Sequence, residues 1–241
     1  MFDLANFKMS EMIECGAAMR ELGKKARSME ESASRIVSYL YNQFIDQNTG
    51  KRAFALVRFF KTHPYGDLDE ELQGFAQSLM GKRRVSRRTK CLVLLATVGE
   101  NPLWNSRKNS KGHKAIPLPS EQVVSQIPMI SQLVYQLGLK INDVIKPNPA
   151  LLVELEQKTF NVFYVSETAG SPFVPAQQDF VIPYGIKSAL GFGGLFPNGD
   201  LFAAIMFSKV FVSRDVADMF KTLSLSTKMA ILPFWDERIF S

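Results

Sequence analysis

Few side chains in this chain are of the types that form metal or catalytic sites. Its 241 residues include two histidines, His63 and His113, and two cysteines, Cys15 and Cys91. A metal site needs several such ligands at short spacing, and the histidines stand fifty residues apart. Neither has a supporting triad motif, and the GxSxG nucleophile signature is absent. We therefore expect no metal site and no catalytic residue. The cofactor stays unknown, because haem would need only one of these histidines.

The cysteines and a glycine run also lack the context that chemistry requires. Cys15 and Cys91 belong to no CxxC pair, and two thiols cannot build a disulfide framework, so we expect both to be buried as small hydrophobic groups. The segment 191–196, Gly-Phe-Gly-Gly-Leu-Phe, fits neither GxGxxG nor the P-loop pattern. A strand follows it, where a phosphate site would need a helix N-terminus. Its glycines instead predict a bulge or a strand approached closely by its neighbour.

Positive charge is concentrated in one segment. The chain has a formal net charge of +6, and between residues 82 and 114 Glu100 is the only carboxylate. The basic residues there are Lys82, Arg83, Arg84, Arg87, Arg88, Lys90, Arg107, Lys108, Lys111 and Lys114. Such a block can attract nucleic acid, although Trp104 is its one aromatic residue and no reading motif accompanies it. The other interpretation is a solvated loop that keeps an edge strand from pairing with other chains.

Composition limits the broad class. Hydrophobic residues make up 46% and charged residues 22%, as in ordinary globular proteins. No apolar run reaches the length of a membrane span, and charged residues stand where a signal peptide would be apolar. We therefore predict a cytoplasmic protein without a membrane span.

Hydrophobic periodicity predicts helices and strands in alternation. The predicted order is helix, strand, helix, strand, several helices, three strands and a closing helix, which favours an α+β fold with helices packed on a central antiparallel sheet. Pro197-Asn198-Gly199-Asp200 supplies a hairpin turn. A long polar stretch, 99–119, shows no pattern of its own. The predicted helices are 6–44 with a break at Gly23, 68–80 capped by Asp67, 120–137 divided at Pro128, 142–158 and 212–232; the predicted strands are 52–60, 91–98, 160–165 and the two of the hairpin.

From about residue 29 to 232 the chain resembles a GAF domain, a module whose architecture the PAS domain largely shares. The resemblance depends on the helix 29–44, the strand 53–60, the strand 201–208 and a final helix of about twenty residues. Its most family-like segment is Gly185-Ile-Lys-Ser-Ala-Leu190. The whole chain is also similar to sensory regions that precede bacterial histidine kinases. This divides the chain into a helical extension 1–28, a sensory domain 29–233 and a linker 234–241 toward an output domain.

The resemblance implies a non-catalytic sensory or regulatory domain. Such a domain binds a small molecule between its sheet and the segments that cover it, or docks a partner, and passes the change through its terminal helices. Here the covering segments would be 99–119 and 167–184, with Trp104, Arg107, His113, Phe163, Phe180 and Tyr184 as candidate ligand-binding residues. The apolar stripe of residues 1–22 would pair in a homodimer.

Several specific activities of GAF-type proteins do not fit this sequence. Bilin-binding members need a suitably placed cysteine, and Cys91 stands in an apolar strand. Reductases of free methionine sulfoxide use several loop cysteines, and the Asn-Lys-Phe-Asp-Glu pattern of cyclic-nucleotide binders is not evident. The alternatives that remain are a nucleic-acid-binding protein using residues 82–114 and a hydrolase or transferase without an identifiable nucleophile.

Overall fold

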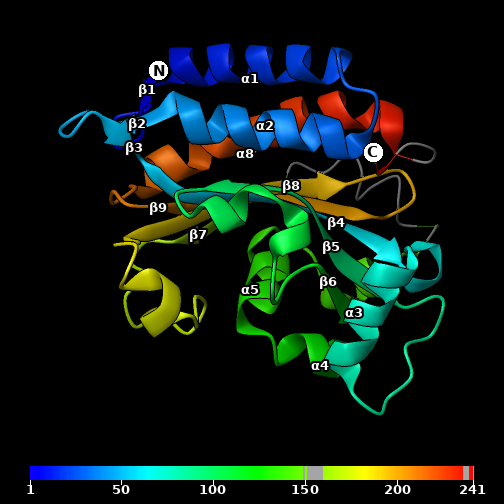
Figure 1. Cartoon of the computed structure of the whole chain (residues 1–241). Helices are drawn as coiled ribbons and strands as arrows, with labels where there is room; N and C mark the ends of the chain where they lie inside the picture. The colour runs from blue at the N-terminus through cyan, green and yellow to red at the C-terminus, as the bar shows by residue number, and fades with distance from the viewer. Residues whose placement is uncertain (149, 151–159, 236–238, 241) are drawn as a thin grey trace.

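A six-stranded antiparallel sheet forms the centre of the molecule (Figure 1). The computed structural model describes residues 1–148, 150, 160–235 and 239–240. The strand order is β6-β5-β4-β9-β8-β7, and every neighbouring pair is antiparallel. The predicted α+β class with helices on an antiparallel sheet is therefore confirmed. The strands are β4 (Phe54–Pro64), β5 (Lys90–Gly99), β6 (Ala115–Leu118), β7 (Phe163–Val165), β8 (Ser188–Leu195) and β9 (Leu201–Ser208).

Each face of the sheet packs against its own hydrophobic core, so its central strands are apolar on both sides. On β4, Val57 and Phe59 belong to one core, whereas Leu56 and Phe60 belong to the other. We call these the first and second faces. Helices α1 (Met9–Lys24), α2 (Met29–Gln43) and α8 (Arg214–Ile231) cover the first face, above the sheet in Figure 1. Helices α4 (Glu121–Ser125), α5 (Pro128–Gln136) and α6 (Ile141–Ile145) lie against the second.

The N-terminal helix packs on its own chain. Met12, Cys15 and Met19 of α1 are buried in the first-face core, and α1 lies along α8. A Cβ added at Gly23 would lie 2.4 Å from the Ala230 carbonyl oxygen, which shows how closely the two helices approach. The stripe from which a homodimer was predicted is therefore covered within the chain, while Met9 and Ile13 remain exposed. The break predicted near Gly23 is confirmed, because α1 ends at Lys24 and α2 begins at Met29.

The predicted hairpin joins β8 to β9. The Phe196 backbone N–H donates to the Asp200 carbonyl at 2.9 Å, and Gly199 has a φ of 79°, which glycine adopts without strain. The close approach predicted for the glycine run is also found, since a Cβ at Gly193 would lie 2.3 Å from the Phe202 carbonyl oxygen.

Some boundaries and small strands differ from the sequence prediction. Helix α3 (Glu70–Met80) is capped by Asp69, whose carboxylate accepts from Leu72 N–H, and not by Asp67, which ends a short 3₁₀ turn. The stretch 99–119 contains the edge strand β6, which pairs with β5 in spite of its proline. A small sheet of β1 (Phe2–Asp3), β2 (Phe44–Asp46) and β3 (Lys51–Arg52) was not predicted.

Two predictions reach beyond the described residues. Most of the predicted helix 142–158 lies outside them, and only its first turns are seen, as α6. In the predicted linker 234–241, residues 236–238 and 241 also lie outside. The Ile239 carbonyl accepts a hydrogen bond from Glu30 N–H at 2.8 Å.

Among the described helices, none combines the length and apolar character that a membrane crossing demands.

Candidate functional site

Polar side chains interrupt the apolar strand β4 at Arg58, Lys61 and His63. Lys61 and His63 are buried, and Arg58 is largely buried. Burying a charge in an apolar core is costly unless the charge is paired. The partners that each side chain has in the fold therefore indicate what it does.

Lys61 is fully paired and has a structural role. Its ammonium donates to Asp200 Oδ2 at 2.8 Å and to the Thr62 carbonyl at 3.1 Å, and Lys90 forms a second ion pair with the same carboxylate. Burial alone would raise the pKa of Asp200, but the two lysines outweigh burial and hold that pKa below its usual range. This buried triad fastens the β8–β9 turn to β4 and β5.

Arg58, in contrast, has no protein partner among the described residues. Its Nε is buried without a hydrogen bond, whereas its two terminal nitrogens are not buried, and the guanidinium forms no ion pair within that part of the chain. The strand register places Arg58 on the second face, directly opposite Thr97 on β5 and Ile205 on β9. The Thr97 hydroxyl is likewise buried and unpartnered among these residues. Burial lowers the pKa of Arg58 to about 10, so the side chain is positively charged at neutral pH.

An aromatic cluster lies over the adjacent row of the same face. That row contains Leu56, Phe207 and Gly99, each two residues along its strand from the Arg58 row. The Phe180 ring packs edge-on against Phe207 at 4.8 Å between centroids, and Trp104 stands 4.4 Å from the Tyr184 ring. Asn101 Nδ2 donates to the Tyr184 hydroxyl at 3.1 Å. The two segments predicted to cover the sheet therefore meet, and bring Trp104, Phe180 and Tyr184 together.

The other candidate ligand-binding residues are placed differently. Phe163 is fully buried on β7, in the same transverse row as Arg58. His113 keeps exposed surface, and its pKa is lowered by the groups packed around the ring and then by the charge of Arg58. Arg107 lies away from this cluster, because its guanidinium pairs with Glu30 of α2 at 2.5 Å and stacks on Phe240.

Sequence reasoning missed Arg58 and Thr97 as site residues. The available signal was a lone charge inside the otherwise apolar run 53–60. A charged side chain destabilises a buried strand, so it is expected there only where the protein's function needs it. Thr97 gave no signal, because threonine is common in strands.

The arrangement is suited to binding an anion. A cation and a hydroxyl stand beside an aromatic surface, which suits an anionic group attached to an apolar body. Within the described residues no group of histidine, cysteine or carboxylate side chains could hold a metal ion. Burial raises the pKa of both Cys15 and Cys91 to about 12, so neither thiol supplies a thiolate at neutral pH.

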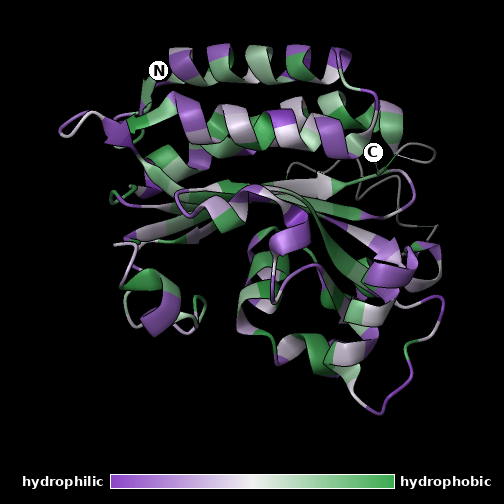
Figure 2. Cartoon of the chain, in the orientation of Figure 1, coloured by the Kyte–Doolittle hydropathy of each residue, from purple (hydrophilic) through white to green (hydrophobic). Residues whose placement is uncertain are grey.

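The basic segment is partly used within the fold. Lys90 pairs with Asp200, Arg107 with Glu30 and Lys114 with Glu71. Five exposed basic residues follow α3, in the loop that is mostly purple in Figure 2. Two more, Lys108 and Lys111, are exposed between β5 and β6. Binding of nucleic acid by this segment stays a prediction.

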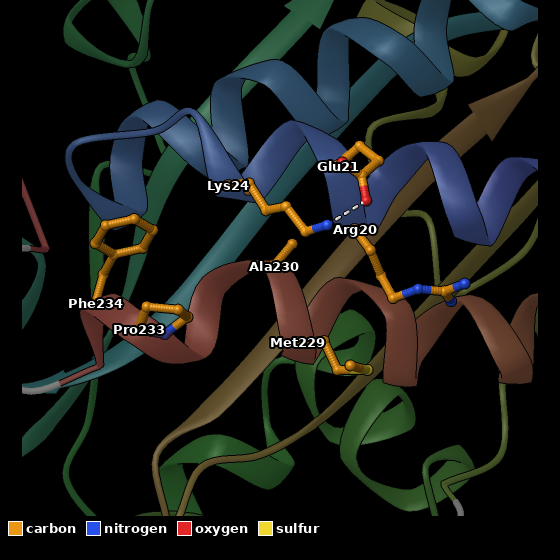
Figure 3. A pocket seen from close by; sticks show the side chains of 8 residues that line it. Arg20, Glu21, Lys24, Met229, Ala230, Pro233 and Phe234 are labelled. Carbon is orange, nitrogen blue, oxygen red and sulfur yellow. Dashed lines mark hydrogen bonds and ion pairs between the residues drawn. The ribbon is translucent and has the colours of Figure 1, made fainter.

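A separate hollow of about 330 Å³ lies between the ends of α1 and α8 (Figure 3). Its lining includes the aliphatic parts of Met229 and Pro233 and the exposed ion pair of Lys24 with Glu21. Arg20, at its edge, donates to Ser226 Oγ at 2.8 Å. The polar groups of this hollow have partners, and we do not assign it a ligand.

Comparison with known proteins shows likeness of shape without close relatives. No protein-family model matches the chain, and no curated protein matches it. Solved structures that resemble the chain include GAF domains. One comes from a phosphoenolpyruvate-protein phosphotransferase of Acinetobacter (12% identity, 91% of this chain and 92% of that chain, TM-score 0.44). Another, from a cyanobacterial phytochrome, holds phycoerythrobilin (10%, 92% and 97%, TM-score 0.39).

A free methionine-R-sulfoxide reductase of Neisseria meningitidis is also similar (11% identity, 97% of this chain and 93% of that chain, TM-score 0.47). The GAF resemblance inferred from the sequence thus recurs among the solved structures. At these identities and scores the likeness concerns shape, and the functional argument rests on the residues of this chain.

Proposed function

We propose that this chain is a non-catalytic sensory domain that binds a small molecule on the second face of its sheet. The observation that carries the proposal is Arg58, a largely buried cation whose Nε has no hydrogen bond and which lies on the same face of the sheet as the aromatic cluster. Holding a largely buried cation without a protein partner is a cost to folding that a structural role does not explain. Binding of a complementary group is the role that does.

The strand that carries Arg58 also offers a route to the terminal helices. The neighbouring residues Val57 and Phe59 face the other core, where α2 and α8 pack. A ligand that draws β4 toward the second face changes the packing beneath α2 and α8. The closing helix α8 follows β9 directly, so one of the two strands beside Arg58 leads into the helical layer.

The proposal also covers the output domain, the oligomeric state and the location of the protein. The domain would regulate an attached output domain, a histidine kinase in the first instance, through α1, α2 and α8. A homodimer would form through the exposed part of the helical layer, where Met9 and Ile13 of α1 leave apolar surface. We place the protein in the cytoplasm, as its sequence predicts.

Native mass spectrometry of the full chain tests the proposal while the ligand is still unidentified. The chain is purified rapidly, and its mass is compared before and after denaturation. We expect a fraction to carry a small molecule, and we expect hydrogen exchange to slow in β4 and at the base of α2 when that molecule is present. A chain that carries no molecule, and whose exchange is unaffected by cell extract, would contradict the proposal.

A further inference from the structure

We infer that the ligand is a small organic acid whose carboxylate pairs with Arg58 and whose apolar body lies against Trp104, Phe180 and Tyr184. This inference deepens the proposed function and rests on it. It specifies a ligand class, where the proposal above requires only some small molecule.

The charge pattern favours a single negative charge. A guanidinium matches the planar carboxylate through two parallel hydrogen bonds. The lysines of β4 and β5 are engaged elsewhere, because Lys61 and Lys90 both pair with Asp200, and Lys61 lies on the opposite face of the sheet. Arg107 is paired with Glu30, so it does not add a second charge to the second face. One unpaired guanidinium balances one carboxylate, whereas a phosphate dianion would be left half compensated.

The Thr97 hydroxyl adds a second contact to the same group. Side chains directly opposite each other on antiparallel strands have Cβ atoms about 5 Å apart. Thr97 and Arg58 are such a pair, and both are unpartnered among the described residues. Each carboxylate oxygen accepts more than one hydrogen bond, so the hydroxyl can donate to one oxygen while the guanidinium binds both.

Strand geometry sets the size of the apolar body. Residues two apart on a strand are separated by about 6.8 Å. The aromatic cluster lies over Leu56 and Phe207, one such step from Arg58 and Ile205. A carboxylate at Arg58 thus reaches the cluster through a chain of two or three carbons ending in a ring or a branched alkyl group. Part of the Arg58 side chain is accessible, which gives the acid a way to approach.

Matched acids and neutral analogues test this inference. Phenylacetate, 3-phenylpropionate and octanoate are titrated by calorimetry against the full chain, each beside its own amide. The variants are Arg58→Met, Thr97→Val and, as a control that removes an exposed positive charge, Arg84→Met. We expect at least one acid to bind more tightly than its amide. Loss of charge-assisted bonds should raise its Kd about ten- to a hundredfold in Arg58→Met and less in Thr97→Val. Arg84→Met should bind as wild type.

Each contrary result has a distinct meaning. Equal binding of acids and amides, unaffected by Arg58→Met, would overturn the carboxylate inference and leave a small-molecule sensor. Failure of all three acids would also overturn the inference, while a bound molecule in native mass spectrometry would keep the proposed function. Circular dichroism of each variant checks its fold, and Thr97→Val supplies a second test that does not depend on the charge.

Discussion

Replacement of Arg58 by methionine should stabilise the ligand-free protein. In most proteins, removal of a largely buried arginine breaks hydrogen bonds and lowers stability. Here the guanidinium has no partner among the described residues, and Leu56, Phe60 and Ile205 surround its strand position on the same face. Methionine fills a similar volume with flexible apolar groups, so the variant removes an unpaired charge without opening a cavity.

The size of the effect follows from the pKa of Arg58. Burial lowers this pKa from 12.5 to about 10. Each unit corresponds to about 1.4 kcal/mol, so this lowering by about 2.5 units gives about 3.5 kcal/mol against folding at neutral pH as an upper figure. Because water reaches part of the side chain, we expect a gain of about 1 to 2 kcal/mol. For a domain of this size, that gain raises the melting temperature by about 2 to 8 °C.

Urea unfolding at pH 7.5, followed by circular dichroism, measures the change. Arg58→Lys keeps the charge, so we expect it to bring no gain. Arg35→Met serves as the opposite control, because Arg35 is ion-paired with Glu31 and its loss should leave stability unchanged or slightly lower. A free energy of unfolding for Arg58→Met that lies about 1 kcal/mol or more below wild type would refute the reasoning, since it would show that Arg58 has a structural partner.

Three further predictions concern the rest of the fold. Asp200→Asn should lower the free energy of unfolding by about 3 to 5 kcal/mol in urea titrations, because it leaves the buried Lys61 and the partly buried Lys90 without their carboxylate. An effect below about 1 kcal/mol would contradict the structural role. His63 is buried neutral beside Lys61 and Asp200, with its pKa well below 6.5. Below about pH 6.5 the unfolded chain takes up a proton on this histidine that the folded chain excludes, so the free energy of unfolding falls by up to about 1.4 kcal/mol per pH unit; above that pH the histidine costs nothing. His63→Leu should therefore flatten the curve of unfolding free energy against pH between about pH 7 and 5. An unchanged slope would refute this. Gly23→Ala should lower the melting temperature, because the new methyl group would meet the Ala230 backbone, whereas Gly74→Ala, where nothing lies within 4 Å, should not.

The fold class could be predicted because its signals are local. Strands β4, β5, β8 and β9 are apolar runs, the hairpin has its turn residues, and α2 and α8 have clear amphipathic periodicity. Strand β6 could not be predicted, because Ala115–Leu118 is short, contains proline and becomes a strand only by pairing with β5. The fold-back of α1 was missed for the same reason. Its apolar stripe shows that a partner exists, but not that the partner is α8 of the same chain.

The sequence could predict the segments that cover the sheet, but it could not predict the part that Arg58 has in the proposed site. Trp104, Phe180 and Tyr184 were expected because long segments beside a sheet provide the walls of ligand sites, and the structure brings these three together. Arg107 was chosen from the same segment, but its pairing with Glu30 depends on tertiary contacts between distant parts of the chain. That Arg58 has no acidic neighbour could be learned only from the strand register, which places Thr97 and Ile205 opposite it.

The contrast between Arg58 and Lys61 explains why one is assigned to binding and the other to stability. Both are cations on β4, three residues apart, and lie on opposite faces of the sheet. Lys61 has a buried carboxylate that also binds Lys90, so its charge is compensated within the fold. For Arg58 the described chain offers no such carboxylate, and substitution by an apolar residue would be the simplest way to relieve the cost. A sequence that retains this charge gives up stability at one position, and such a local conflict is expected where function, and not folding, determines the residue.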